Sequence, residues 1–340
     1  MAPVRRAALS GFPPAAGLHC SSTSVRAALA FDGVRVSEAL AFGLGSGLGC
    51  FYLKTEGSSP SRVLNGRAPD LEGSFYRHVG RPLAWAGRWD PEAMAASLAA
   101  SRPVLAQTDL FHLPYYQPPV RFPGHGVVVV AVDLDAGTAR IADQGFSEVQ
   151  EVDLECLRKA METMAPPLLP APFRWAAAPR VPESALDAPE VFASALRRTV
   201  RVMAGEEEAG EGVEALAVLA RDLRSWADLP DFAWCARFAY QGIEKRGTGG
   251  GAFRFLYASF LREAESRWGP RGLERAARLY EKAGEGWRAL AAAFKAVFAS
   301  GDRALFADCA REAEELASAE ASALEALRSL SRDLDPALFR

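Results

Sequence analysis

Three side chains of this sequence are of the types that catalyse acyl transfer or hydrolysis through a covalent intermediate. They are a thiol, an imidazole and a carboxylate, in the chain order Cys20, His125, Asp143. In such chemistry the thiolate attacks a carbonyl carbon, the histidine takes up the thiol proton, and the acid holds the histidine in place. The prediction depends on whether the surrounding elements bring these residues together.

Cys20 lies at the predicted start of a helix. Ser21 and the next three residues are of helix-starting types, apolar residues then recur at helical spacing, and Gly33 is a suitable stop. The positive end of a helix dipole favours a thiolate. The backbone N–H groups of Cys20 and Ser21 would stabilise a developing oxyanion. The alternative is a buried structural thiol, because free cysteine is among the most buried residue types.

A predicted β-hairpin brings His125 and Asp143 together. His125 opens a β-branched run that ends at Asp133, which is typical of a strand buried on both faces. A turn at residues 135–137 leads to a second strand, residues 138–142, which ends at Asp143. The start of the first strand then lies beside the end of the second. The alternatives are a histidine bonded to backbone and an aspartate that caps its own turn.

Two further segments offer candidate substrate contacts. Ser46 and Gly47 lie in a stretch with four glycines in residues 43–49, where the backbone must bend tightly or let a ligand approach. The other interpretation of that stretch is a turn packed against the Cys20 helix. Tyr115 and Tyr116 lie in an aromatic, proline-stiffened loop, and they are candidates as well.

The length of 340 residues allows two domains with a core each. We expect a mixed α+β catalytic domain over residues 1–165, a proline-rich linker over 166–189, and an all-helical domain over 190–340. The predicted helices of the last part are alanine-rich and span about 186–203, 212–227, 230–245, 252–267, 270–298 and 302–332.

A glycine-rich loop in the helical part, GTGGG, precedes one of these helices. Thr248, Gly249 and Gly250 could bind an anion such as a phosphate through backbone N–H groups, and Arg254 could add charge. The alternative is a tight glycine turn between packed helices.

Composition excludes several classes of function. The net charge of −3 gives no electrostatic reason to expect nucleic acid as a partner. No apolar run is long enough for a membrane span, and Pro13-Pro14 interrupts the only stretch that resembles an export signal. The five cysteines are scattered and lack metal-ligand spacing, which predicts a cytoplasmic protein without a metal site. Tryptophan- and leucine-rich helices could support a homodimer.

Several separated motifs, in order, resemble one known family. GLHCSSTSVRAAL, SEALAFGLGSGLGCFY, TDLFHLPYY, FPGHGVVVVAVD and IADQG are similar to the N-terminal domain of the butirosin-biosynthesis acyltransferase family. The segment GTGGGAFRFLYASFL resembles the uncharacterised helical domain that often follows it. The resemblance covers residues 17–332.

This resemblance implies a papain-like fold, related to the bacteriocin-leader cysteine peptidases, that is used for acyl transfer in antibiotic biosynthesis. It places the nucleophile on Cys20, the base on His125 and the acid on Asp143. The enzyme itself would bind no cofactor. The acyl donor would be the phosphopantetheine thioester of an acyl-carrier protein, or a coenzyme A thioester, and the acceptor a small-molecule amine or hydroxyl.

One feature departs from the peptidase pattern, because no glutamine stands a few residues before Cys20 to complete an oxyanion hole. The departure argues against efficient proteolysis. Two alternatives remain beside acyl transfer: a cysteine hydrolase (thioesterase, amidase or peptidase), and a non-catalytic module that binds a carrier protein.

Overall fold

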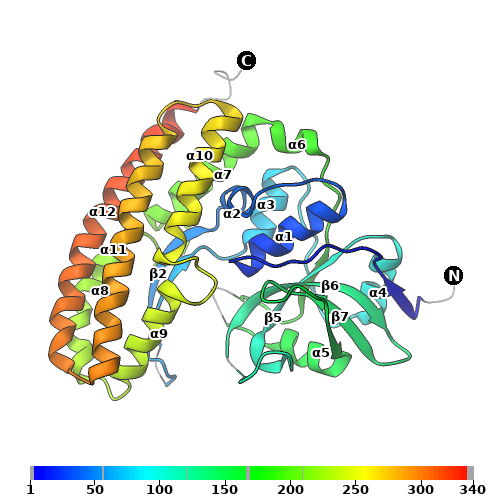
Figure 1. Cartoon of the computed structure of the whole chain (residues 1–340), viewed down its shortest axis with the longest axis horizontal. Coiled ribbons are helices and arrows are strands. Elements are labelled where there is room, and N and C mark those ends of the chain that lie inside the picture. Colours follow the sequence, from blue (N-terminus) through cyan, green and yellow to red (C-terminus); the bar gives the residue numbers. More distant parts are fainter. Residues whose placement is uncertain (1–3, 56, 120, 166–168, 209, 335–340) are drawn as a thin grey trace. The chain divides into compact units, whose positions relative to one another are not determined.

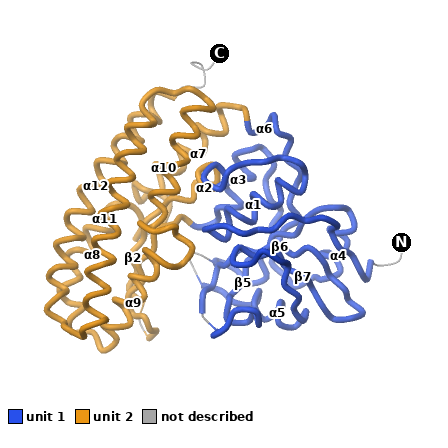
Figure 2. The backbone as a smooth tube through the Cα atoms, viewed as in Figure 1, with its two compact units in different colours: residues 1–41, 69–186 blue, residues 42–68, 187–340 orange. Residues whose placement is uncertain are grey.

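The computed structural model describes residues 4–55, 57–119, 121–165, 169–208 and 210–334. The chain divides into two compact units (Figure 2). Unit 1 comprises residues 1–41 and 69–186, and unit 2 comprises residues 42–68 and 187–340. Each unit is therefore built from two separate stretches of chain.

Unit 1 is built on a seven-stranded sheet with the order β4-β9-β5-β6-β7-β8, in which β1 also pairs with β6. All of its pairings are antiparallel. The strands are β1 (Arg6–Ala8), β4 (Ala86–Gly87), β5 (Val104–Asp109), β6 (Pro123–Asp133), β7 (Thr138–Ala142), β8 (Gln150–Asp153) and β9 (Arg174–Ala177). The valines at 127–130 of β6 are at most 2% exposed, which explains the unbroken β-branched run.

Helices cover this sheet, with α1 and α5 on opposite sides of it in Figure 1. The helices that begin in unit 1 are α1 (Cys20–Phe31), α2 (Glu38–Leu44), α3 (Leu71–His78), α4 (Pro91–Ala99), α5 (Leu154–Glu162) and α6 (Glu183–Asp187). A short 3-10 helix, η1 (Leu110–His112), follows β5. The first residue of α1 is Cys20 itself.

Unit 2 combines a β-hairpin with a group of helices (Figure 1). The hairpin is β2 (Leu48–Lys54) and β3 (Arg62–Arg67), and the α-helices are α7 (Pro189–Ala204), α8 (Val213–Asp222), α9 (Phe232–Glu244), α10 (Arg254–Trp268), α11 (Leu273–Ser300) and α12 (Phe306–Asp333). Short 3-10 turns, η2 (Leu223–Asp228), η3 (Gly251–Phe253) and η4 (Arg303–Leu305), connect some of them. The two longest helices, α11 and α12, pack along each other.

Apolar residues spaced three and four apart form the buried face of α12, and one charged residue lies among them. Glu320 is fully buried and pairs with the equally buried Arg254, with Oε1 2.6 Å from Arg254 Nε. Trp287 Nε1 donates a second hydrogen bond to the same oxygen, at 2.6 Å. Arg254 also donates to the carbonyl oxygens of Gly66 and Ala252, at 2.9 and 2.7 Å. The pair thus connects α10, α12 and the β-hairpin inside unit 2.

The expected fold class, an α+β domain followed by helices, is confirmed. The hairpin of β6 and β7 forms over the predicted residues, with Asp133 opposite Thr138. The predicted helices of the second half also form, with bounds that differ by a few residues.

The units do not follow the predicted boundaries. Residues 42–68 group with the helices of unit 2, because they form a hairpin that packs there. The predicted linker also contains ordered elements: β9 pairs with β5 inside the sheet, and α6 follows it. Residues 166–168 of that linker lie outside the described residues.

Replacement of Glu320 by alanine is expected to destabilise unit 2, because it leaves the buried Arg254 guanidinium without its carboxylate. The expected loss in the free energy of unfolding is about 3–5 kcal/mol. Urea denaturation followed by tryptophan fluorescence measures it. Glu325→Ala, which removes an exposed ion pair with Arg332 from the same helix, is the control and should leave the midpoint unchanged. Equal midpoints for both variants would contradict the assigned role of Glu320.

Candidate active site

Cys20, His125 and Asp143 form one buried cluster in unit 1. His125 Nε2 lies 2.8 Å from Asp143 Oδ1, and the exposed fractions of the two residues are both 1%. Cys20 is 3% exposed and its side chain is hydrogen-bonded to His125. Since Asp143 occupies Nε2, the other ring nitrogen, Nδ1, remains for the thiol. The predicted proximity of His125 and Asp143 is confirmed.

The electrostatics of the cluster favour a charged imidazole. Burial lowers the pKa of His125, but the charge of Asp143 and the hydrogen bonds to Asp143 and Cys20 outweigh it and raise the pKa to about 10. Burial also opposes ionisation of Asp143, yet the His125 charge and the donated hydrogen bonds hold the pKa of that carboxyl below its usual value. An imidazolium beside the thiol stabilises the thiolate that a nucleophile requires.

Tyr115 and Tyr116, predicted to be substrate contacts, lie against the acid and the imidazole. The Tyr115 hydroxyl donates a hydrogen bond to Asp143 Oδ2 at 2.9 Å, so the two carboxylate oxygens have different donors. The ring of Tyr116 meets the ring of His125 edge to face, with centroids 5.7 Å apart. Burial, together with the negative charge of Asp143, raises the pKa of both tyrosines. These contacts favour a role in holding His125 and Asp143 in place.

Glu38, at the start of α2, fixes the turn that carries the nucleophile. Its carboxylate accepts hydrogen bonds from the backbone of His19 at 2.7 Å and of Leu18 at 3.0 Å. A side chain on Gly17 would collide with it, because an added Cβ would lie 2.6 Å from Glu38 Oε2. The glycine three residues before Cys20 therefore permits the close approach of the acid.

The imidazole of His19 caps α1. Its Nδ1 accepts a hydrogen bond from Ser22 N at 3.3 Å, and the first backbone bond of the helix runs from Thr23 N to the His19 carbonyl at 3.0 Å. The amides of Cys20 and Ser21 precede that bond, at the positive end of the helix. They are the backbone groups that we predict to stabilise an oxyanion.

Two family models match this chain. Residues 19–144 match the model described as "Butirosin biosynthesis protein H, N-terminal", and residues 155–327 match "Domain of unknown function (DUF4872)". The second match covers more than half of the chain. The chain therefore belongs to the DUF4872 family, and residues 19–144 are similar to the N-terminal domain of butirosin biosynthesis protein H. The resemblance predicted from the motifs is thereby confirmed. A comparison with curated proteins found no match.

The region that matches the butirosin biosynthesis protein H model contains all three residues of the buried cluster. It begins one residue before Cys20 and ends one residue after Asp143. The catalytic roles of the three residues stay a prediction, since the family match does not name them.

Ser46 and Gly47, the other candidate contacts in the first half of the chain, lie in unit 2. Ser46 is fully buried and its hydroxyl donates to the Ala195 carbonyl at 2.9 Å. The Gly47 amide donates to the Phe42 carbonyl, and its own carbonyl accepts from Ala68 N. Their polar groups are therefore engaged by the protein itself. An added Cβ on Gly43 would overlap the ring of Phe260, which explains that glycine by close packing within unit 2.

The GTGGG loop, which falls within the DUF4872 match, also uses its amides internally. Gly250 N donates to the Thr248 hydroxyl, and Gly251 N donates to Glu244 Oε1, both at 3.0 Å. Glu244 places a carboxylate where a bound phosphate would need a donor. Arg254 is fully buried in its ion pair with Glu320. These contacts favour the alternative interpretation, a tight glycine turn between packed helices.

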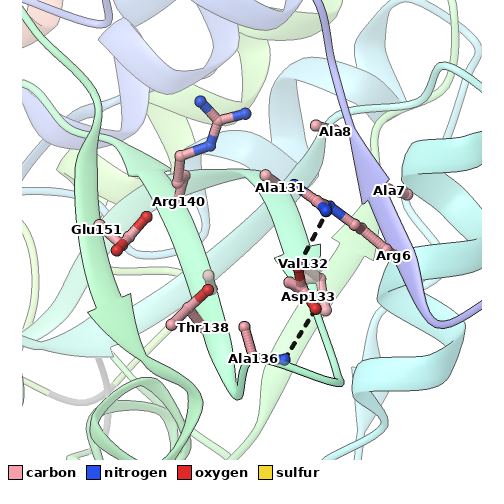
Figure 3. Close-up of a pocket in the computed structure, with 11 residues that line it drawn as sticks. Arg6, Ala7, Ala8, Ala131, Val132, Asp133, Ala136, Thr138, Arg140 and Glu151 are labelled. Carbon is pink, nitrogen blue, oxygen red and sulfur yellow. Dashed lines mark hydrogen bonds and ion pairs between the residues drawn. The ribbon is translucent and has the colours of Figure 1, made fainter.

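A separate hollow lies at the other end of β6 (Figure 3). Its lining includes Arg6, Asp133, Arg140 and Glu151, with an ion pair of 3.2 Å between Arg6 and Asp133. Asp133 is eight residues beyond His125, roughly 26 Å along an extended strand, so the hollow is distinct from the cluster around Cys20. Within the described ranges, no group of three or more histidine, cysteine or acidic side chains could hold a metal ion. No helix in these ranges is long and apolar enough to cross a membrane.

The raised pKa of His125 gives a direct prediction. In the wild type its ring should titrate near pH 10, and in Asp143→Asn the pKa should fall well below 10, because only Cys20 then opposes the effect of burial. Since the folded pKa lies above the unfolded value, the associated stability is complete below pH 6.5 and is lost as the pH rises through 10.

NMR of histidine-labelled protein measures this titration, with the His125 signal assigned from its loss in His125→Gln. Asp135→Asn, in the exposed turn of the same hairpin, is the control and should retain the wild-type titration. A wild-type ring that titrates near pH 6.5 would contradict the described electrostatics.

Proposed function

We propose that this protein is a cysteine-dependent acyltransferase of antibiotic or related natural-product biosynthesis. The observation that supports it most is the single buried cluster of thiol, imidazole and carboxylate, with the Cys20 amide at a helix start. The family name, which refers to butirosin biosynthesis, supports the biosynthetic setting.

In the first half of the reaction the Cys20 thiolate attacks the carbonyl carbon of an acyl thioester. The carbonyl π electrons move to oxygen, and the amides of Cys20 and Ser21 stabilise this oxyanion. When the intermediate collapses, the bond to the donor sulfur breaks and the His125 imidazolium protonates the departing thiolate. An acyl-enzyme and a free donor thiol result, so one thioester is exchanged for another.

In the second half an amine or hydroxyl attacks the acyl-enzyme. Neutral His125 accepts its proton, the carbon–sulfur bond breaks, and Cys20 leaves as the thiolate beside an imidazolium. Asp143 and Tyr115 hold the imidazole in place throughout.

The donor would be an acyl-carrier protein or coenzyme A thioester, and the acceptor a small molecule. No cofactor resident in the enzyme takes part in these steps. A cytoplasmic location and a homodimer also stay predictions.

Replacement of Cys20 by alanine is expected to abolish acyl loading, because no other group in the cluster forms a thioester. Intact-mass spectrometry after incubation with S-acyl N-acetylcysteamine thioesters (acetyl, butyryl and benzoyl) measures loading. Cys156→Ala, which removes a half-buried thiol outside the cluster, should load as the wild type does. A Cys20→Ala variant that still gains the acyl mass would exclude this mechanism.

The fate of the loaded acyl group separates transfer from hydrolysis. With hydroxylamine as the acceptor, we expect the hydroxamate to exceed the free acid, and its yield to rise with acceptor concentration. Chromatography of the products measures both. Free acid at a rate independent of the acceptor would instead identify a hydrolase. An alkylatable Cys20 that no thioester loads would favour a non-catalytic binding module.

A further inference from the structure

The proposed reaction would be accelerated by a donor to the oxyanion beyond the backbone amides of Cys20 and Ser21. Preorganised donors at the position of the developing charge are among the largest contributions to catalysis of acyl transfer. No glutamine that could act as this donor stands a few residues before Cys20, and the residue at position 14 is a proline, which has no side-chain donor. The neighbouring amides of Leu18 and His19 already donate to Glu38. A side chain from another part of unit 1 would add a donor to the amides of Cys20 and Ser21.

We propose that the carboxamide of Gln144 is this donor. The assignment rests on the proposed function and identifies a catalytic residue that the family match does not. Gln144 directly follows Asp143, in a turn closed by a hydrogen bond of 3.2 Å from Phe146 N to the Asp143 carbonyl. The turn thus places Gln144 next to the acid of the cluster.

A backbone contact joins Gln144 to the turn of the nucleophile. The Gly17 amide donates to the Gln144 carbonyl at 3.2 Å, three residues before Cys20. From there the Glu38-bound backbone of Leu18 and His19 leads directly to the start of α1. Gln144 therefore lies beside the turn that directly precedes Cys20.

The side chain of Gln144 is available for this role. Its Oε1 is buried and makes no hydrogen bond within the described part of the chain, although the residue as a whole is half-buried. A turn residue on a protein surface ordinarily extends its carboxamide into water. The buried atom is the acceptor Oε1, and no hydrogen bond of Nε2 is observed among the described residues, which leaves Nε2 as the donor for a ligand atom during the reaction.

Gln107 is a second glutamine of unit 1 with a buried carboxamide oxygen. It is 4% exposed, lies on β5 directly opposite Gly126, and its Oε1 also makes no hydrogen bond among the described residues. An added Cβ on Gly126 would meet Ser21 Oγ at 3.1 Å and Glu72 Oε1 at 2.7 Å, so this side of β6 is filled by protein. Gln107 thus lies in a packed interior near Ser21, and the backbone contact with Gly17 favours Gln144 over it.

The test compares two reactions of the same thiol. Acylation by a thioester passes through an oxyanion, whereas alkylation by iodoacetamide displaces iodide directly and forms none. For Gln144→Leu we expect the rate of Cys20 acylation by butyryl-N-acetylcysteamine to fall by about 10²–10³-fold. The rate of alkylation should stay within about twofold of the wild type, since the thiolate and His125 are unchanged. Stopped-flow mixing and mass spectrometry measure both rates.

Gln107→Leu is the matched variant and should acylate at the wild-type rate. Equal acylation rates for Gln144→Leu and the wild type would overturn the assignment, as would a parallel loss of alkylation, which indicates a structural role. A loss in Gln107→Leu alone would move the donor to β5. If the wild type itself is not acylated while Cys20 still alkylates, the proposed function fails, and that result is distinct from the others.

Discussion

The hydrogen bond between His125 and Asp143 is the interaction on which the candidate site depends, and it is a product of β-sheet register. β6 and β7 pair so that the start of one strand adjoins the end of the other. A shift of one residue in this pairing would turn one of the two side chains to the opposite face of the sheet. The register is the one that places Val128 opposite Ala142 and Asp133 opposite Thr138. The pairing of the two strands thus determines the geometry of two polar residues at their ends.

Burial alone would neutralise this pair, and the surrounding hydrogen bonds prevent that. Each oxygen of Asp143 has its own donor, His125 on one side and Tyr115 on the other. A carboxylate satisfied in this way stays charged within the protein and keeps the imidazole protonated. On the other side of the cluster Glu38 binds the backbone of Leu18 and His19, directly before Cys20. Acids at both ends of the cluster therefore hold it in place without contacting the thiol.

The sequence predicted the parts of this site that depend on local patterns. Cys20 at a helix start follows from residue types and spacing, and the proximity of His125 to Asp143 follows from a short hairpin. Glu38 and Tyr115 could not be assigned in the same way, because their partners lie 19 and 28 residues away and no periodicity links them. The predicted domain boundaries differ from those of the two units for a similar reason. A hairpin early in the chain packs among helices that come more than a hundred residues later. Long-range packing of this kind leaves no local signature.

The burial of Glu320 is indicated by the helical periodicity of the sequence. Glu320 falls on the apolar stripe of α12, at a position where a charge must be paired or expelled. Its partner, Arg254, follows a loop of glycines whose amides are bound to Thr248 and Glu244. The residues from which a phosphate site was predicted are therefore bonded to other groups of the protein. An arginine after a glycine-rich loop indicates anion binding only when it has no ion pair with an acidic side chain of the same unit. An acidic residue on the buried face of a neighbouring helix is the place in the sequence to look for such a partner.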